Sequence, residues 1–157
     1  MGSFTGSGGA AFSSERDDWE TPPEVFRRCD EIWHFDLDAA SSDGNALCER
    51  HFTKADDGLS QDWSGRRVWC NPPCGREIGK WVRKAYESAS GGGCIVVMLL
   101  PARTDTAWFH EYCAKADEVA LLRGRLRFRI NGEQMQSAPF PSMLVRFGGS
   151  LSERSGR

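Results

Sequence analysis

The sequence predicts an α/β fold whose sheet is mainly parallel and ends in an antiparallel strand. Segments of strand-like composition alternate with segments whose apolar residues recur at helical spacing, which is typical of parallel sheets. The apolar run 94–100 lies between three glycines and Pro101, as expected for a central strand that is covered on both faces. At 157 residues, 39% of them hydrophobic, the chain is long enough for one domain with a real core.

The domain is expected to span residues 17–149, between a flexible arm (1–16) and a disordered tail (150–157). The arm is rich in glycine and serine and has little apolar surface to bury. No apolar run approaches the length that spans a bilayer, and no signal peptide is evident, so we expect a cytoplasmic protein. The net charge is −2, so binding to a polyanion requires a local basic patch.

The first helix is expected to begin at Thr21, which can cap it, with Pro22 at the first helical position and Glu24 completing a capping box. Residues 35–40 predict a short strand that ends at Asp38, followed by two small residues that would let a ligand approach the backbone. Residues 45–48 indicate a short helix, and residues 55–59 an acidic turn.

A strand through Val68 and Trp69 ends in Asn71-Pro72-Pro73-Cys74. Prolines cannot continue a central ladder, so this loop is rigid and presents the Asn71 side chain.

The second half of the chain predicts a helix over 78–85 that stops at glycines 91–93, the central strand 94–100, and a third helix from Trp108 to Cys113. Residues 118–130 and 142–147 are predicted as strands joined by the turn Asn131-Gly132 and a polar loop. Because ligands bind at the carboxyl ends of parallel strands, segments 38–39, 71–74 and 101–105 are expected to meet in one cleft.

These residues resemble a known family. Asn71-Pro72-Pro73 is similar to the Asp/Asn-Pro-Pro-aromatic motif of amino-methyltransferases that use S-adenosylmethionine. Glu20-Thr21-Pro22-Pro23-Glu24 looks like their cofactor-side segment, and segments 101–105, 108–109, 123–125 and 138–142 resemble phage-type DNA N-6-adenine methyltransferases. The resemblance runs in order from Trp19 to Phe147. It implies a compact Rossmann-like class I methyltransferase sheet and a phage or prophage protein acting in a bacterial host cell.

The implied reaction is methylation of the N6 amine of adenine in DNA. The Asn71 side-chain oxygen and the Pro72 carbonyl would each accept one N–H of the amine and aim its lone pair at the methyl group, which then transfers directly in line. Pro73 would fix this geometry and Cys74 would lie beside the base. The target base must be flipped out of a duplex or offered on a single strand.

The resemblance also implies the cofactor site. Glu20, Thr21 and Pro22 would lie along the methionine end, and Asp38 would accept from the ammonium group. The remaining expected contacts to S-adenosylmethionine are Ala39, Ala40, Asp57, Gly58, Leu59 and Asn71. Thr21 as a plain helix cap and Asp57 as a plain turn residue are the structural alternatives. The glycine-rich loop usual after the first strand is replaced by residues 39–44.

Arginines at 123, 125, 127 and 129 alternate, so one strand would place four guanidinium groups on one face for phosphate contact. A solvated strand face is the alternative. The expected DNA contacts are Arg103, Thr104, Asp105, Trp108, Arg123, Arg125, Arg127 and Phe140.

Cys74 departs from the family pattern, because an aromatic ring usually stands there to stack on the base. Either another ring substitutes, with Trp108, Phe109 and Phe140 as candidates, or the protein is a catalytically weakened or inactive homologue that binds DNA or nucleotides. An Asn-Pro-Pro motif also serves methyl transfer to a glutamine amide, whereas enzymes that methylate the N4 amine of cytosine more often carry serine at the position of Asn71. No metal is expected, although Cys48, His51, Cys70 and Cys74 form a minor alternative zinc set.

Overall fold

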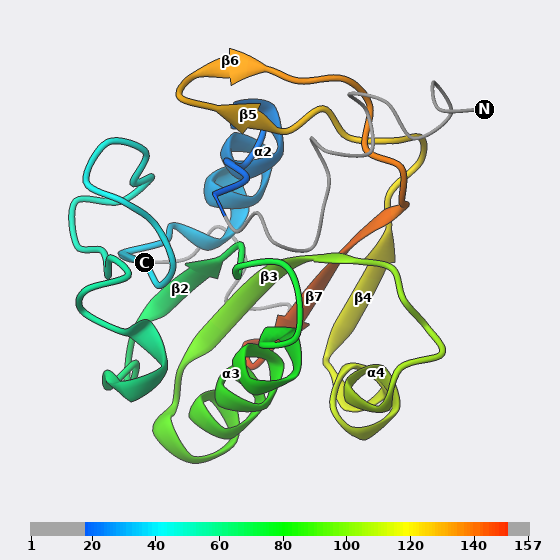
Figure 1. Cartoon of the computed structure of the whole chain (residues 1–157). Helices are drawn as coiled ribbons and strands as arrows, with labels where there is room; N and C mark the ends of the chain where they lie inside the picture. Colours follow the sequence, from blue (N-terminus) through cyan, green and yellow to red (C-terminus); the bar gives the residue numbers. More distant parts are fainter. Residues whose placement is uncertain (1–17, 151–157) are drawn as a thin grey trace.

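The computed structural model describes residues 18–150, which form a five-stranded sheet with helices on both faces (Figure 1). The predicted arm (1–16) and all but the first residue of the predicted tail (150–157) lie outside the described residues and stay predictions. No helix within residues 18–150 is long and apolar enough to cross a bilayer.

The sheet has the strand order β1-β2-β3-β7-β4. Its strands are β1 (Leu37–Asp38), β2 (Arg67–Cys70), β3 (Ile95–Pro101), β7 (Ser142–Phe147) and β4 (Glu118–Leu121). β1, β2 and β3 pair in parallel, and β7 is antiparallel to both β3 and β4. Four strands therefore point one way and the last strand runs against them, which confirms the predicted sheet.

The helices are α2 (Pro23–Trp33), α3 (Ile78–Gly92) and α4 (Ala107–Glu111), and the 3₁₀ turns are η2 (Gly58–Ser60) and η3 (Cys113–Lys115). A separate hairpin of β5 (Arg129–Ile130) and β6 (Glu133–Gln134) lies beside α2, away from α3 and α4 (Figure 1).

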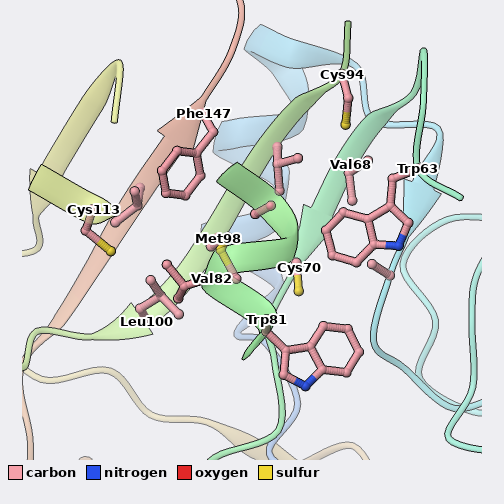
Figure 2. Close-up of a cluster of buried hydrophobic side chains, with 14 of the residues drawn as sticks. Trp63, Val68, Cys70, Trp81, Val82, Cys94, Met98, Leu100, Cys113 and Phe147 are labelled. Atoms are coloured by element: carbon pink, nitrogen blue, oxygen red, sulfur yellow. The ribbon is translucent and has the colours of Figure 1, made fainter. Parts of the chain in front are cut away.

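The core has two halves, one on each face of the sheet, because successive strand residues point to opposite faces. Val68, Cys70 and Met98 face α3 and pack with Trp81 and Val82 (Figure 2). The other half contains Trp19, Trp33, Trp69, Ile95, Val97, Leu99, Phe128 and Ala138, and α2 packs against it. Every residue of β3 is buried, as predicted for the central strand.

Three predictions about helices differ from the structure. The capping box at α2 is wrong: its N-cap is Pro22, with no side-chain cap, because the Thr21 hydroxyl is engaged elsewhere. The third helix is α4, capped by Thr106, and it breaks at Tyr112 before η3. No helix forms at residues 45–48, where bends and turns follow β1.

The predicted strand over 118–130 is also wrong in extent. β4 ends at Leu121, where its pairing with Met143 of β7 ends, and the chain then turns at Gly124 with a left-handed φ of 78°. The turn Asn131-Gly132 closes the small β5–β6 hairpin instead of linking two strands of the main sheet. Both turn residues have positive φ, which suits a tight two-residue hairpin.

Candidate active site

A cavity of about 690 Å³ opens at the carboxyl ends of β1 and β2. This volume lies within the range of small-molecule sites. Its walls come from the segment before α2, the chain after β1, the turn before η2, the loop after β2 and the tip of the β5–β6 hairpin. The residues expected at the cofactor that line it are Glu20, Thr21, Asp38, Ala39, Ala40, Asp57, Gly58 and Asn71. Most of the residues predicted to contact the cofactor therefore line one cavity.

Two members of that set lie behind the wall. Pro22 is buried at the start of α2, and Leu59 packs against the core on the α3 face. Neither side chain lines the cavity.

Asp38 ends β1 and is 2% exposed. Its two carboxylate oxygens accept from the backbone N–H groups of Ala40 (3.3 Å) and Leu47 (3.0 Å). Burial raises the pKa of the Asp38 carboxyl to about 6, against the lowering effect of these two hydrogen bonds. A cationic ligand in the cavity would offset the cost of keeping this carboxylate charged.

Asp57 and Gly58 form a tight corner of the cavity. Asp57 has a left-handed φ of 55°, unusual for a residue with a side chain. Its carboxylate has no hydrogen-bond partner among residues 18–150. A Cβ at Gly58 would collide with the Ala39 carbonyl oxygen and touch the ring of Trp81. Only glycine therefore lets the backbone approach so closely here.

The ring of Trp81 forms part of the cavity floor and packs beside Trp63, with ring centroids 6.2 Å apart (Figure 2). Trp63 in turn donates from Nε1 to the Gly58 carbonyl oxygen over 3.0 Å. The core on the α3 face therefore supports the glycine corner directly.

Ser41 is a cavity residue that the sequence did not single out. Its Oγ atom is buried and has no hydrogen-bond partner among residues 18–150. A buried hydroxyl without a partner is costly, so a polar ligand atom in the cavity would stabilise the site by supplying the missing hydrogen bond. Only its place two residues after Ala39, in the segment that replaces the glycine-rich loop, could have indicated it.

Asn71 follows β2, and its side-chain amide is held from the opposite wall. The Nδ2 atom donates to the Trp19 carbonyl oxygen (3.0 Å) and to Thr21 Oγ1 (3.1 Å). A backbone carbonyl only accepts, so the nitrogen of the amide, and not the oxygen, faces Trp19. No donor within residues 18–150 reaches Oδ1, so this oxygen is available to a ligand.

The rest of the loop leads from the cavity to the α2 face of the sheet. Pro73 lines the cavity, and Pro72 is buried beneath it. The Pro72 carbonyl accepts no hydrogen bond from the described residues. Cys74 packs against the core half that contains Trp19 and Phe128.

The third predicted segment of the cleft, residues 101–105, does not line this cavity. β3 lies one strand farther from β1 than β2 does, so its carboxyl end faces the chain before β7 instead. Ala102 donates its N–H to the Pro141 carbonyl (2.9 Å), and the Arg103 guanidinium lies 5.8 Å from the centre of the Phe140 ring. Thr104 and Asp105 are exposed.

The structure separates the three rings considered as substitutes at position 74. Phe140 packs on the same core half as Cys74 and lies 6.1 Å from Phe128. Trp108 and Phe109 pack on the other half, with α3. Because the sheet lies between the two halves, Phe140 is the ring on the side of Cys74.

The arginine run does not form one strand face. Arg123, Arg125 and Arg127 are exposed on the irregular chain between β4 and β5, while Arg129 lies in β5 and lines the cavity. The expectation of four guanidinium groups on one strand face is therefore wrong. Leu126 and Phe128 still point inward, so Arg125 and Arg127 lie on the outer side.

The alternative zinc set does not gather. No group of three or more potential His, Cys, Asp or Glu ligands forms within residues 18–150. Burial holds the pKa of the Cys70 thiol well above its usual value, which disfavours the thiolate that binds zinc. His51 Nε2 pairs instead with Asp43 over 2.8 Å.

The chain is similar to known proteins over most of its length. The profile of the DNA N-6-adenine-methyltransferase (Dam) family matches residues 9–150. A protein of Escherichia phage T1 named DNA N-6-adenine-methyltransferase is 36% identical over 121 residues, which are 76% of this chain and 50% of that protein. A protein of the same name from Haemophilus phage HP1 (strain HP1c1) is 32% identical over 139 residues, covering 85% of this chain and 80% of that protein. The chain thus spans about half the length of the phage T1 relative.

Proposed function

The chain belongs to the DNA N-6-adenine-methyltransferase (Dam) family, and on this premise we propose that it transfers a methyl group from S-adenosylmethionine to the N6 amine of adenine in DNA. We further assign the sheet to the Rossmann-like class I methyltransferase fold. The strand order β1-β2-β3-β7-β4, in which only β7 is reversed, supports this assignment.

One observation carries the proposal: the Asn71 amide lies at the edge of the cavity with both of its N–H groups bound and its oxygen available. An adenine amine is a poor nucleophile because its lone pair is delocalised into the ring. An acceptor held in place can accept a hydrogen bond from one of its N–H groups and favour a pyramidal nitrogen. The side-chain orientation of Asn71 supplies such an acceptor.

The cavity residues fit S-adenosylmethionine by their chemistry. The cofactor carries an ammonium group, a carboxylate and an adenosine, and when bound it supplies the methyl group on a sulfonium. The buried Asp38 carboxylate suits the ammonium group, and a polar ligand would provide the hydrogen bond that the described part of the chain does not give the Ser41 hydroxyl. The Asp57 carboxylate at the glycine corner can accept from an exocyclic amine or a ribose hydroxyl.

In the proposed mechanism, Asn71 Oδ1 and the Pro72 carbonyl each accept one N–H of the target amine. Proline fixes φ at Pro72 and Pro73, so both acceptors keep their positions while positive charge develops on nitrogen. Neither acceptor needs to be reoriented during transfer, and no covalent enzyme intermediate is required. The bond from the methyl carbon to sulfur would break as the bond to nitrogen forms, and the methylated amine would then lose its extra proton to solvent.

We place the target base against the α2 face, where Cys74 and Phe140 lie. Phe140 would supply the ring that Cys74 lacks, and the neighbouring Arg103 would contact a phosphate. The exposed Arg123, Arg125 and Arg127 would contact the DNA backbone beyond the base. Thr104 and Asp105 are exposed next to Arg103 and would also face the DNA backbone, whereas Trp108 packs with α3 on the other face of the sheet.

The test is incubation of the purified protein with adenine-containing DNA and S-adenosylmethionine labelled in the methyl group. We expect label in the DNA, in proportion to time and enzyme. The sequence difference at Cys74 favours one competitor, an inactive homologue that binds without turnover. DNA or cofactor binding without incorporated label would support that competitor and contradict the proposal.

A further inference from the structure

Thr21 makes contacts that its place before a helix does not explain. It precedes the N-cap of α2, yet its hydroxyl accepts from no backbone N–H within residues 18–150. Instead Oγ1 lies 3.1 Å from Asn71 Nδ2 and 3.4 Å from Trp69 Nε1. Both of these groups are donors only, so the Thr21 oxygen accepts from each of them. Thr21 is 7% exposed and lines the cavity.

The two hydrogen bonds to Asn71 fix which way its amide points. An asparagine amide can turn by half a rotation about its last bond, which exchanges the oxygen and the nitrogen. Here the Trp19 carbonyl and the Thr21 hydroxyl each accept one of the two N–H groups. Turning the amide would place Oδ1 against the Trp19 carbonyl oxygen and would withdraw the acceptor from the cavity.

The short segment that carries both acceptors is itself held in place. Glu20 forms an antiparallel bridge with Arg129, with N···O distances of 2.8 and 3.1 Å. Its carboxylate also accepts from the N–H groups of Asn131 (2.8 Å) and Gly132 (3.0 Å) at the hairpin tip. Because Pro22 is buried on the other side, Thr21 lies between two fixed neighbours and cannot follow Asn71 if the amide turns.

We propose that Thr21 is a positioning residue for methyl transfer: its hydroxyl holds the Asn71 amide with Oδ1 toward the substrate amine. This inference rests on the proposed function and deepens it. Since Thr21 Oγ1 accepts two hydrogen bonds, its own proton is left to donate toward the cavity. The same hydroxyl can therefore contact a bound carboxylate while it orients Asn71.

The test compares Thr21→Val, which has nearly the same shape but no hydroxyl, with Thr21→Ser, which restores the hydroxyl. Rates are measured at saturating S-adenosylmethionine, so that weaker cofactor binding does not lower them. We expect Thr21→Val to lower kcat by about 10- to 100-fold, because the rate of transfer depends on holding the Asn71 oxygen in the correct position against the amine. Thr21→Ser is expected to return kcat to within about threefold of the parent. Thr21→Ala serves as a second variant if the valine protein does not fold.

A second readout does not depend on activity. The side-chain NH₂ signals of Asn71, identified as those lost in Asn71→Ala, are followed by ¹⁵N NMR in each variant. We expect them to shift and exchange faster with water in Thr21→Val and to recover in Thr21→Ser. Unchanged kcat or unchanged Asn71 signals in Thr21→Val would overturn the inference. An inactive parent protein would instead contradict the proposed function, while the NMR comparison would still decide the role of Thr21.

Discussion

The cavity wall and the arginine-bearing chain after β4 are built differently. In the wall, Asp38 is 2% exposed and Thr21 is 7% exposed, and each is held by hydrogen bonds from neighbouring segments. On the arginine side, Arg125 is exposed and makes one long hydrogen bond, 3.4 Å from Nη1 to the Ala138 carbonyl. The side chains of the wall are therefore held by the protein itself.

This difference suits two kinds of binding, that of a small cofactor in the cavity and that of DNA on the exposed arginines. In the proposed function, a small cofactor would be recognised by side chains that the protein already holds in place, which avoids the cost of ordering them on binding. DNA would be attracted by exposed charges whose geometry adapts to the phosphate backbone, with strong salt dependence as the consequence. The following predictions test whether the two regions can be disturbed separately.

The largest effect is expected at Asn71. Asn71→Ala removes the proposed acceptor without adding bulk, and we expect kcat to fall by about 100- to 1000-fold. Cofactor affinity, measured by calorimetry, should stay within a few-fold of the parent, because the carboxylates of the wall remain. Unchanged turnover would remove Asn71 from the mechanism.

Gly58→Ala is expected to distort the cavity without altering the exposed arginines. The added methyl group would collide with the Ala39 carbonyl oxygen and press on Trp81, so the corner must open. We expect a loss of about 1–3 kcal/mol in the free energy of unfolding, with cofactor binding too weak to detect. The matched control is Gly91→Ala in α3, where a Cβ meets nothing within 4 Å. Equal effects of the two substitutions would contradict the tight corner.

Phe140→Ala tests the ring next to Cys74. If Phe140 stacks on the target base, its loss should raise the KM for DNA by about tenfold or more, since base stacking contributes about 1–3 kcal/mol. Cofactor affinity should not change. The comparison variant is Phe109→Ala, whose ring packs on the opposite side of the sheet. A larger effect on KM in Phe109→Ala would place the base elsewhere.

The pKa of Asp38 predicts a pH dependence of cofactor binding. Only the carboxylate attracts an ammonium group, and the pKa of Asp38 in the folded protein is raised from 3.8 to about 6. Affinity should therefore fall about tenfold for each pH unit below 6. The ligand-free protein should respond in the opposite sense: the stability from this group is present below pH 3.8 and is lost as pH rises through about 6. Calorimetric titrations from pH 5 to 8 measure the first effect, and Asp38→Asn should bind weakly at every pH.

The smallest effect is expected on the arginine side. Replacing Arg125 and Arg127 by alanine should weaken DNA binding and lower the slope of log affinity against log salt by about 2. Cofactor binding should be unaltered. Arg83→Ala is the control, because Arg83 is exposed on α3 and pairs with Glu87. An unchanged salt slope in the double variant would show that these guanidinium groups do not contact phosphate.

The sequence predicts the elements that carry long apolar patterns and misses those decided by tertiary contacts. The buried run of β3 and the helix α3, which ends before the left-handed Gly93, follow from hydrophobic spacing and glycine. The end of β4 at Leu121 depends on where β7 stops pairing, which local composition does not encode. Alternating arginines therefore indicated a strand that is not there.

The same limit applies to the site. Asp38 and Asn71 are recognisable because a polar residue at the end of an apolar strand is conspicuous. The Trp19 carbonyl that orients Asn71 is a backbone group 52 positions away, and residue type carries no sign of it. Thr21 likewise is a residue type typical of a helix cap. Only the position of its segment beside the end of β2 shows that its hydroxyl accepts from Asn71 instead.

The most direct test of the account identifies the methylated nitrogen. DNA incubated with the purified protein and methyl-labelled S-adenosylmethionine is digested to nucleosides and analysed by mass spectrometry. We expect N6-methyldeoxyadenosine as the labelled product of the parent protein, and its near absence with Asn71→Ala. Label confined to N4-methyldeoxycytidine, or the same yield of N6-methyldeoxyadenosine from both proteins, would contradict it.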